Sequence, residues 1–296
     1  MAAAVAPFGF INAFKPPGLS STSFGAWVRK RLGAAALGHW GTLDPAAFGV
    51  LVLAVGRATR LIPYLPSESK SYVFEMRAGT CTDTGDATGR VVRTSAVPDD
   101  WARALGQAAA SLVGPLEQTP PMYSAVKVDG RPLYVAARAG RAVERQPRRV
   151  EIASLRVIGT RGDRARLAVD CSAGTYIRTL CEQIGERLGV CAHLAVLLRT
   201  RAGPFALDDA STPDAIARDP ASCLVDPASV LGLETIDVDD AAAAKFAHGN
   251  DAEIAAQRRA DACTVLVRHR GALIGVGRLG AALTPVRVLA AAGENA

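Results

Sequence analysis

The chain has 296 residues, of which 49% are hydrophobic and 21% are charged, and its formal net charge is +6. This composition is typical of a globular protein and excludes a chain that is disordered throughout. The apolar run from Phe48 to Val55 is far shorter than the roughly 20 residues that span a bilayer, which excludes an integral membrane protein. The first ten residues contain no Lys or Arg, so we expect no secretory signal and a cytoplasmic location.

Charge is distributed unevenly along the chain. Residues 131–201 contain 14 Arg, no Lys and 6 acidic residues, whereas residues 202–240 contain one Arg and 9 acidic residues. A basic block followed by an acidic one favours a surface that binds a polyanion such as nucleic acid, although a solvated basic face has the same composition.

The six cysteines and four histidines are dispersed. They contain no Cys-x-x-Cys pair and complete no zinc-ligand spacing. We therefore expect neither a structural metal nor a disulfide framework, and we interpret Cys171, Cys181 and Cys191 as small buried hydrophobic residues.

The N-terminal part alternates strand, helix and loop patterns. They predict a strand at 8–14, a helix capped by Ser20 that ends at Leu32, and a buried strand at 48–55. Between the last two, residues 38–44 (GHWGTLD) contain two glycines and a carboxylate before a proline, which predicts a loop. That loop is the first candidate site.

The middle of the chain is richer in strands. The pattern predicts short helices at 59–65 and 133–139, longer helices at 98–113 and 175–188, turn-rich or connecting stretches at 79–89 and 114–121, and strands at 71–77, 123–128, 150–158, 165–171 and 193–200. Arg178 lies in the first turn of its helix, where the helix dipole disfavours a cation. We therefore expect Arg178 to have an anionic partner elsewhere in the fold.

The acidic stretch at 207–240 predicts a helix-bearing connection to a C-terminal module at 231–296. Within that module the pattern predicts a helix at 241–247 and strands at 264–269, 273–278 and 286–290. We expect this module to form a small β-barrel.

Asp44 is the strongest candidate for a chemical role, because it lies in a loop directly before an apolar strand. Asp before Pro is also a common turn element, so the spacing alone leaves a purely structural role open.

GHWGTLDPAAFGVLVLAVGRATRL at 38–61 resembles the signature of the TruB family, the bacterial tRNA pseudouridine-55 synthases, in which G-H-x-G-T-L-D-P carries the catalytic aspartate. Similar blocks follow the same order over about 190 residues: KPPGLSS at 15–21, KSY at 70–72, TDTGDATG at 82–89, QTPPMYSAVKVDGRPLYVAARAG at 118–140, CSAGTYIRTL at 171–180 and AHL at 192–194. Trp40, Phe48 and Leu198 depart from the family pattern, and we expect them to alter local packing and to leave Asp44 untouched.

The resemblance implies an α+β fold with a mixed, largely antiparallel sheet flanked by helices. Residues 1–230 would form the catalytic domain, with an RNA-gripping insertion at about 79–149, and residues 231–296 would form a small PUA-like RNA-binding β domain. The similarity of this second domain to the family is much weaker and rests mainly on its HGN turn and strands.

The implied reaction converts uridine to pseudouridine in the T loop of tRNA. It breaks the bond from ribose C1′ to N1, turns the uracil and joins C1′ to C5, with no redox step and no external group, so no cofactor is expected. By resemblance, Asp44 is the catalytic carboxylate, which attacks the sugar, attacks C6 or removes the C2′ proton. Arg178 would pair with it, and Tyr72 would stack on the base and help remove the C5 proton.

The resemblance also assigns substrate contacts. Tyr176 and Leu197 would line the uracil pocket, His39 would lie beside the flipped nucleotide, and Lys15 would lie near the substrate. Lys127 would grip RNA from the insertion. Because the target uridine is inside a folded loop, the enzyme must flip it out at a cost of a few kcal/mol.

The expected partner is the T arm of tRNA, bound by a monomer without an obligate protein partner or a membrane. Two other functions share these features. An RNA-guided pseudouridine synthase has the same aspartate motif, although the long stretch at 79–149 and the absence of Lys-rich tails favour the stand-alone form. A tRNA-folding chaperone would gain its benefit from opening and refolding the tRNA elbow, with catalysis secondary.

Overall fold

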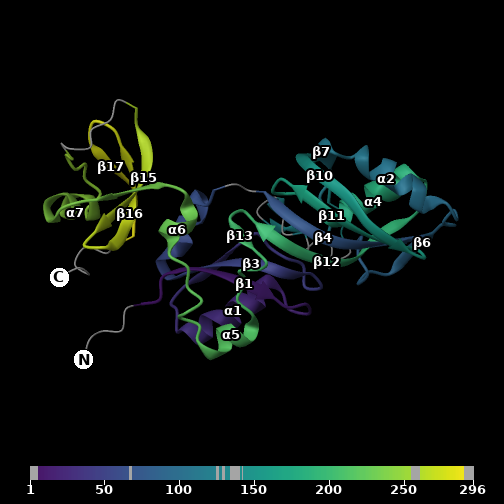
Figure 1. The fold of residues 1–296 in the computed structure, drawn as a ribbon, viewed down its shortest axis with the longest axis horizontal. Helices are drawn as coiled ribbons and strands as arrows, with labels where there is room; N and C mark the ends of the chain where they lie inside the picture. The colour runs from purple at the N-terminus through teal and green to yellow at the C-terminus, as the bar shows by residue number, and fades with distance from the viewer. Residues whose placement is uncertain are drawn as a thin grey trace.

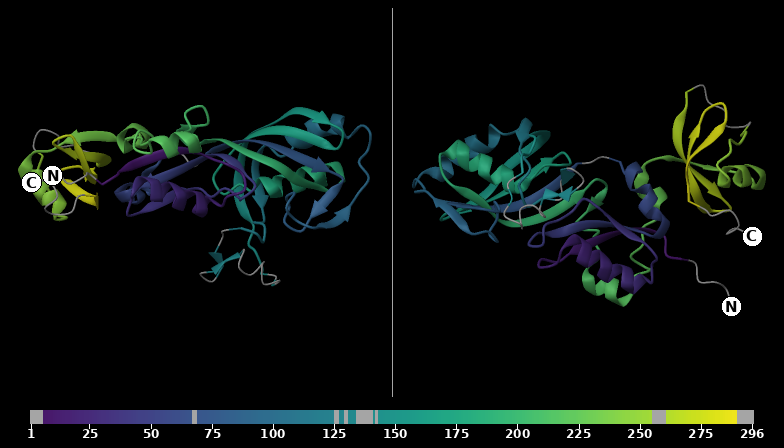
Figure 2. Two further views of the ribbon diagram at one scale, coloured as in Figure 1. Left: turned by 90° about the horizontal axis from the view of Figure 1, so that it is seen from below. Right: turned by 180° about the vertical axis from the view of Figure 1, so that it is seen from behind.

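A computed structural model describes residues 6–66, 69–124, 127–128, 131–133, 141, 143–254 and 261–289. The chain forms an elongated body with the C-terminal module at one end, as the views in Figures 1 and 2 show. The mixed α+β architecture with a largely antiparallel sheet confirms the predicted fold class. Within these ranges no helix is long and apolar enough to cross a bilayer.

The body is built on one sheet in which nine strands are hydrogen-bonded. Its path runs β1-β3-β12-β4-β11-β10-β7, with β2 paired to β3 and β13 paired to β12. The strands are β1 (Gly9–Lys15), β2 (Leu37–Trp40), β3 (Phe48–Val55), β4 (Lys70–Ala78), β7 (Gly114–Gln118), β10 (Arg148–Arg161), β11 (Arg164–Cys171), β12 (Ala192–Ala202) and β13 (Phe205–Ala206). Neighbours pair antiparallel except β3 and β12, which run parallel where Leu198 faces Phe48.

Helices cover the faces of this sheet. Their bounds are α1 (Ser21–Leu32), the 3₁₀ helix η1 (Gly56–Tyr64), α2 (Trp101–Ala110), α4 (Ile177–Leu188), α5 (Pro213–Arg218) and α6 (Pro227–Leu231). Helix α4 packs against β12 and β4, and α2 packs against β10 and α4, whereas α1 and α5 lie against the β1–β3 end. The Ser20 side chain accepts a hydrogen bond from the Ser23 N–H at 3.0 Å and caps α1, as predicted.

The main core lies between the sheet and these helices. Strand β4 illustrates the pattern, because its even-numbered residues from Lys70 to Ala78 are buried and those between them are more exposed. Alternate residues of a strand point to opposite faces. Tyr72 therefore points to the same face as Phe74 and Met76, toward α4 and the core.

Two small sheets lie outside the main one. Strand β5 (Thr80–Thr82) pairs with β6 (Val91–Thr94), and β8 (Lys127–Val128) pairs with β9 (Arg131–Pro132). Of the helix predicted at 133–139, only Leu133 lies among the described residues.

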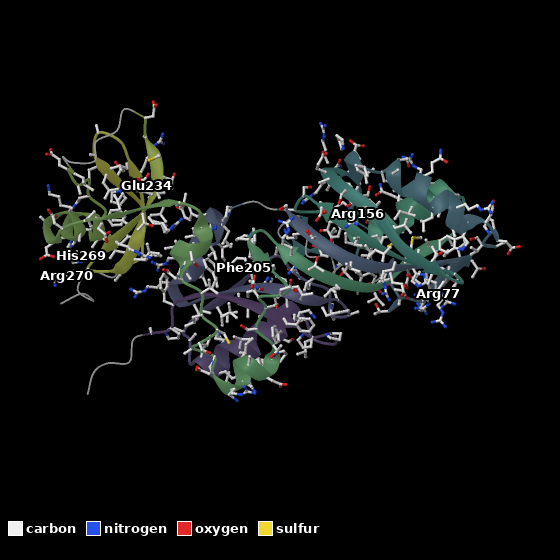
Figure 3. The ribbon with its side chains drawn as sticks, in the orientation of Figure 1. Arg77, Arg156, Phe205, Glu234, His269 and Arg270 are labelled. Carbon is white, nitrogen blue, oxygen red and sulfur yellow. The ribbon has the colours of Figure 1, made fainter. Side chains whose placement is uncertain are left out.

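The C-terminal module contains a four-stranded sheet. Its order is β14 (Glu234–Asp237), β15 (Cys263–His269), β16 (Ala272–Leu279) and β17 (Leu283–Val288), with α7 (Asp240–Ala247) packed against β17. The described residues show an open ladder, in which the first pair is parallel and the others are antiparallel, in place of the predicted closed barrel. His269 and Arg270 lie on this module, whereas Arg77 and Arg156 lie on the opposite half of the molecule (Figure 3).

The module is joined to the body through η1. Leu266, Val276 and Leu289 share a buried cluster with Phe10 and Leu61 of the body. At the same contact the Arg57 and Arg60 guanidinium groups donate to the carbonyls of Leu289 and Val288 at 3.2 and 3.3 Å.

Four predicted elements differ from the structure. Residues 114–118 of the predicted connector form strand β7, and residues 80–82 of the predicted turn-rich stretch form strand β5. Residues 37–40 form strand β2 where a loop was expected, because an edge position beside β3 gives their backbone groups partners from Val55 to Val52 despite the glycine at 38. Residues 123 and 124 are bends where a strand was predicted at 123–128, and of the rest of that range the structure describes only β8. Most other predicted strands and helices are present to within a few residues.

Candidate active site

A pocket of about 320 Å³ opens where the loop before β3, strands β4 and β12, and the start of α4 meet. This volume is at the lower end of the range for small-molecule sites, roughly 300–1,000 Å³. Its lining residues are Gly41, Thr42, Leu43, Asp44, Lys70, Tyr72, Ser124, Gly174, Thr175, Tyr176, Ile177, Arg178, Leu197 and Arg199. The structure thus brings together five of the eight residues expected from the sequence, namely Asp44, Tyr72, Tyr176, Arg178 and Leu197.

Asp44 is held in place by its own loop. The Ser21 hydroxyl donates to the Leu43 carbonyl at 2.9 Å and accepts from the Leu43 N–H at 2.8 Å. The Ala47 N–H donates to the Asp44 carbonyl at 3.0 Å and closes a turn. Because the backbone on both sides is tied down, the Asp44 side chain projects into the pocket, where it remains 40% exposed.

Arg178 provides the counter-charge. Its Nε lies 3.1 Å from Asp44 Oδ2, and its Nη2 donates to Asp44 Oδ1 at 3.4 Å. The guanidinium also donates to the carbonyls of Thr84 at 3.1 Å and Tyr123 at 2.7 Å. This ion pair confirms the expectation of an anionic partner for a cation in the first turn of a helix, and it leaves the Arg178 side chain only 5% exposed.

The loop at 82–89 supports Arg178 from the other side. Asp86 Oδ2 lies 3.9 Å from Arg178 Nε, and Asp86 Oδ1 accepts from the Thr84 hydroxyl at 2.8 Å and the Thr88 N–H at 2.9 Å. The loop is fastened to β12, since the Leu194 N–H donates to the Gly85 carbonyl at 3.0 Å. Two carboxylates thus face one guanidinium, and only Asp44 is in close contact with it.

Burial raises the pKa of the Asp44 carboxyl above its ordinary value. The Arg178 charge opposes this rise and the Asp86 charge adds to it. Desolvation disfavours the ionised form, and the ion pair offsets much of that cost. The arrangement therefore gives a carboxylate that is more basic than one in water and is oriented by a planar donor.

Two tyrosines and a serine form the walls of the pocket. Tyr72 is 7% exposed, and burial raises the pKa of its phenol, so its hydroxyl is protonated at neutral pH. Burial likewise raises the pKa of Tyr176. The Ser124 hydroxyl is buried beside Tyr176, close enough to lower the pKa of that phenol, yet it makes no aligned hydrogen bond within the described part of the chain.

Arg199 and Lys70 line the pocket and were not expected from the sequence. Arg199 is fully buried, and its guanidinium donates to the carbonyls of Val50 at 2.6 Å, Thr42 at 3.4 Å and Gly41 at 3.0 Å. These bonds tie β12 to the loop that carries Asp44. Arg199 reaches the pocket because of the register of the parallel β3–β12 pair. That register cannot be predicted from a single sequence.

Gly49 makes this contact possible. It faces Arg199 in the parallel pair and has a φ of +103°, and a Cβ atom at that position would lie 2.3 Å from the Arg199 carbonyl oxygen. Any other residue would separate the two strands.

The three departures from the family pattern, Trp40, Phe48 and Leu198, lie near the pocket, and Leu198 faces Phe48 in the parallel pair. The Trp40 ring packs so closely on Gly203 that a Cβ there would lie 2.7 Å from it, and Lys70 Nζ is 5.5 Å from the ring centroid. The Phe48 ring lies 6.3 Å from that of Phe14, between centroids. These contacts surround the parallel β3–β12 pairing and leave Asp44 free to face the pocket.

Of the other three expected residues, Lys15 and His39 are not among the residues that line the pocket. Lys15 is fully buried and its amine donates to the carbonyls of Pro16, Leu19 and Pro45 at 2.9, 2.7 and 3.3 Å, and burial lowers its pKa to about 8. His39 lies in β2, where burial lowers its pKa and its Nδ1 has no hydrogen-bond partner among the described residues. The side chain of Lys127 lies outside the described part of the chain.

The described residues contain no group of three or more His, Cys, Asp or Glu side chains that could hold a metal ion. What the pocket offers is a carboxylate paired with a guanidinium, with aromatic and aliphatic walls. Such a carboxylate can bond to an electrophilic carbon or accept a proton from one.

Comparison with known families gives two matches. A model described as "TruB family pseudouridylate synthase (N terminal domain)" matches residues 29–177, and one described as "tRNA pseudouridylate synthase B C-terminal domain" matches residues 178–220. These ranges include Asp44, Tyr72, Tyr176, Arg178 and Leu197.

Curated relatives share these matches. A protein named tRNA pseudouridine synthase B from Symbiobacterium thermophilum is 45% identical over 245 residues, which cover 81% of this chain and 82% of that protein. A protein of the same name from Aromatoleum aromaticum is 48% identical over 219 residues, or 73% of this chain and 70% of that protein.

Solved structures share the fold over most of the chain. The "Crystal Structure of a Cbf5-Nop10-Gar1 Complex" contains a chain that is 27% identical with a TM-score of 0.67, and the match covers 97% of this chain and 86% of that one. The "Structure of H/ACA RNP bound to a substrate RNA containing 2'-deoxyuridine" contains one that is 25% identical, with the same coverage and TM-score.

Proposed function

The chain belongs to the TruB family of pseudouridylate synthases, and we propose that its target is the T-loop uridine at position 55 of tRNA. It is an isomerase that converts uridine to pseudouridine in tRNA. We propose that Asp44 is the residue that reacts with the substrate. The observation that supports the role of Asp44 is its ion pair with Arg178 inside the pocket. A carboxylate that is partly desolvated and oriented by two donor atoms is poised to react with the flipped nucleotide as nucleophile or as base.

The pocket residues take complementary roles in this proposal. Tyr72 stacks on the uracil, and because burial keeps its phenol protonated at neutral pH, the hydroxyl is available as a hydrogen-bond donor. Tyr176 and Leu197 form the remaining walls and exclude water while the uracil turns. Arg178 positions Asp44 and stabilises its negative charge as the bond from C1′ to N1 breaks.

Residues outside the pocket support it. Lys15 uses its three donors on backbone carbonyls around the Asp44 loop, which favours a bracing role at the edge of the substrate. His39 lies on β2, in the strand that leads into the catalytic loop, and we propose that it contacts the nucleotide flanking the flipped uridine. We propose that Lys127 contacts the RNA backbone from the 79–149 insertion.

We also propose that the chain works as a monomer in the cytoplasm, with the module from residue 231 as a PUA-like tRNA-binding domain. The curated relatives are bacterial proteins named as tRNA enzymes, which supports action on tRNA directly. The matched solved structures are a Cbf5-Nop10-Gar1 complex and an H/ACA RNP bound to a substrate RNA, so an RNA-guided enzyme is the alternative to test.

The test uses the purified chain with an unmodified tRNA transcript and no other protein or RNA. Pseudouridine mapping should find one modified position, 55, and a transcript with cytidine at that position should remain unmodified. The Asp44→Asn variant should bind tRNA within a few-fold of the wild type and give no conversion, because the amide keeps the shape but loses the nucleophile or base.

Three results would contradict the proposal. A requirement for a guide RNA would favour the RNA-guided alternative. Modification at other positions would reject the T loop as target. Asp44→Asn retaining more than about a hundredth of the wild-type rate would remove Asp44 from the reaction. If the Asp44→Asn variant fully restored the growth of cells that lack this protein, the result would instead support a chaperone role with catalysis secondary.

A further inference from the structure

Two cysteines from distant parts of the chain meet outside the catalytic pocket. Cys81 lies in the middle of β5, and Cys191 immediately precedes β12. The Gly79 N–H donates to the Cys191 carbonyl at 2.8 Å, and His193 Nδ1 lies 2.8 Å from the Thr80 carbonyl. The segments at 79–81 and 191–193 therefore run side by side.

The two thiols lie near each other on these adjacent segments. Each influences the pKa of the other, and an Arg93 guanidinium nitrogen lies 3.7 Å from Cys81 Sγ as a donor. Cys81 is partly exposed, whereas Cys191 is only 2% exposed. Cysteines on two segments that run side by side can be bridged when a small movement brings their sulfur atoms together.

The surroundings of the pair favour ionisation of Cys191, whereas burial raises the pKa of the Cys81 thiol. Burial opposes ionisation of Cys191, but the Cys81 thiol and the Arg93 guanidinium outweigh it and lower the pKa of Cys191. Two other cysteines lack such surroundings, because Cys171 donates to the Lys70 carbonyl at 3.7 Å and burial raises its pKa to about 11, and Cys181 is fully buried. A thiolate beside an arginine is the form that reacts with oxidants.

We propose that Cys81 and Cys191 are a redox modification site, at which a peroxide converts the two thiols into a reversible disulfide. The pair is distinct from the pocket, which is lined by neither residue. In a reducing compartment such a bond forms transiently and is removed by thiols, as redox-sensing disulfides are.

The oxidation balances with hydrogen peroxide as the oxidant. The Cys191 sulfur, whose pKa is lowered, attacks one peroxide oxygen. The O–O bond breaks, an S–O bond forms, and the thiol proton leaves with the other oxygen as water. The Cys81 sulfur then attacks the sulfenic sulfur of Cys191, the S–S bond forms, and the hydroxyl leaves with the Cys81 proton as a second water. The two thiols lose two electrons and the peroxide gains them.

This bridge would lie close to the loop at 82–89, which contacts Arg178 through the Thr84 carbonyl. The Leu194 N–H donates to the Gly85 carbonyl at 3.0 Å, and the Ala87 N–H donates to the Leu194 carbonyl at 2.9 Å. A disulfide between residues 81 and 191 would add a covalent tie to the same two segments and close a long loop of chain. The oxidised protein should therefore unfold at a higher temperature than the reduced one.

The test treats the fully reduced, full-length chain with stoichiometric hydrogen peroxide and then blocks the remaining thiols by alkylation. The wild type should lose two of its six alkylatable thiols and the mass of two hydrogen atoms. Trypsin should release a cross-linked species made of residues 78–90 and 188–199, each of which contains one cysteine. Dithiothreitol should restore both thiols and return the unfolding temperature to that of the reduced protein.

Matched variants assign the pair. Cys81→Ser and Cys191→Ser should each abolish the cross-link, whereas Cys223→Ser, which removes a cysteine whose thiol lies against the Asp219 carbonyl, should keep it. Arg93→Gln should slow the loss of thiols several-fold at neutral pH. Sulfinic or sulfonic acids on unlinked cysteines, a bridge between other cysteines, or six intact thiols after treatment would each overturn the proposal.

Discussion

The Arg178 guanidinium grips the Asp44 carboxylate at both oxygens, with Nε 3.1 Å from Oδ2 and Nη2 3.4 Å from Oδ1, across 134 residues of sequence. The same guanidinium is fixed by the carbonyls of Thr84 and Tyr123. Four contacts from one planar group leave the carboxylate little freedom to rotate, so its position is set by the fold and not by the substrate.

Replacing Arg178 with lysine should slow chemistry more than it weakens binding. Lysine keeps the charge but cannot reproduce the planar contacts to Asp44 and to two carbonyls. We expect the single-turnover rate at saturating tRNA to fall by about 100-fold, equivalent to about 2.7 kcal/mol in the barrier, with little change in Kd. Arg187→Lys, in the last turn of the same helix, is the matched control. If Arg178→Lys weakened binding and left the single-turnover rate normal, Arg178 would be a phosphate contact.

The acid limb of the rate should lie above the ordinary pKa of aspartate. Burial and the Asp86 charge raise the pKa of Asp44, and protonation of Asp44 removes the reactive form. Asp86→Asn deletes one of the charges that raise this pKa, so ionised Asp44 becomes easier to form and the acid limb should move to lower pH. The profile of single-turnover rate against pH measures the shift independently of any loss of maximal rate. Asp163→Asn, an exposed partner of Arg77, serves as control, and a limb that moved upward would contradict the assignment.

Lys15 should leave a signature in the pH dependence of stability. Its pKa in the folded protein is about 8 against an ordinary value of 10.5, so between these pH values the unfolded chain binds more protons at this residue. Stability contributed by Lys15 therefore rises as pH increases from about 8 to about 10.5, by up to roughly 3 kcal/mol.

Lys15→Met removes this titration. Urea denaturation across this range measures the free energy of unfolding of both proteins. The value for the wild type minus the value for the variant should increase with pH. Lys30→Met, on the exposed face of α1, controls for the loss of a lysine charge. A constant difference would show that Lys15 titrates normally in the fold.

Binding of tRNA should depend steeply on salt, because exposed arginines such as Arg156 and Arg166 are available to phosphates. The affinity should fall with a slope of about 0.9 or less per neutralised phosphate on logarithmic axes. A chelator should leave turnover of a pre-folded T-arm stem-loop unchanged. Loss of turnover on that substrate would reject the expectation of a cofactor-free reaction.

The sequence, together with its family resemblance, was sufficient to predict that Asp44 and Arg178 form a pair. Asp44 stood out as a carboxylate before a buried strand, and Arg178 as a cation at the wrong end of a helix, and the structure joins these two anomalies into one ion pair. Local patterns of this kind survive in one sequence because each is an exception to the chemistry of its own element.

The long-range packing was not accessible in the same way. Arg199 reads as one arginine among many in a basic block, and only the register of β12 against β3 shows it to be buried and bonded to three carbonyls. Strand β2 was not predicted because Gly38 favours a loop. Its backbone forms a strand because it pairs with an edge of β3. Tertiary pairing decided both cases, and local propensity carries no information about it.

The bond from Arg199 to the Val50 carbonyl also orders events during protein synthesis. The two residues are 149 positions apart, so the ribosome adds Arg199 long after Val50. At about 5–20 residues per second, the ribosome exposes the Asp44 loop roughly 8–30 seconds before it supplies the strand that secures that loop. A nascent chain in this interval has its aspartate but not the strand that completes the pocket, so the catalytic site is assembled only after Arg199 has been synthesised.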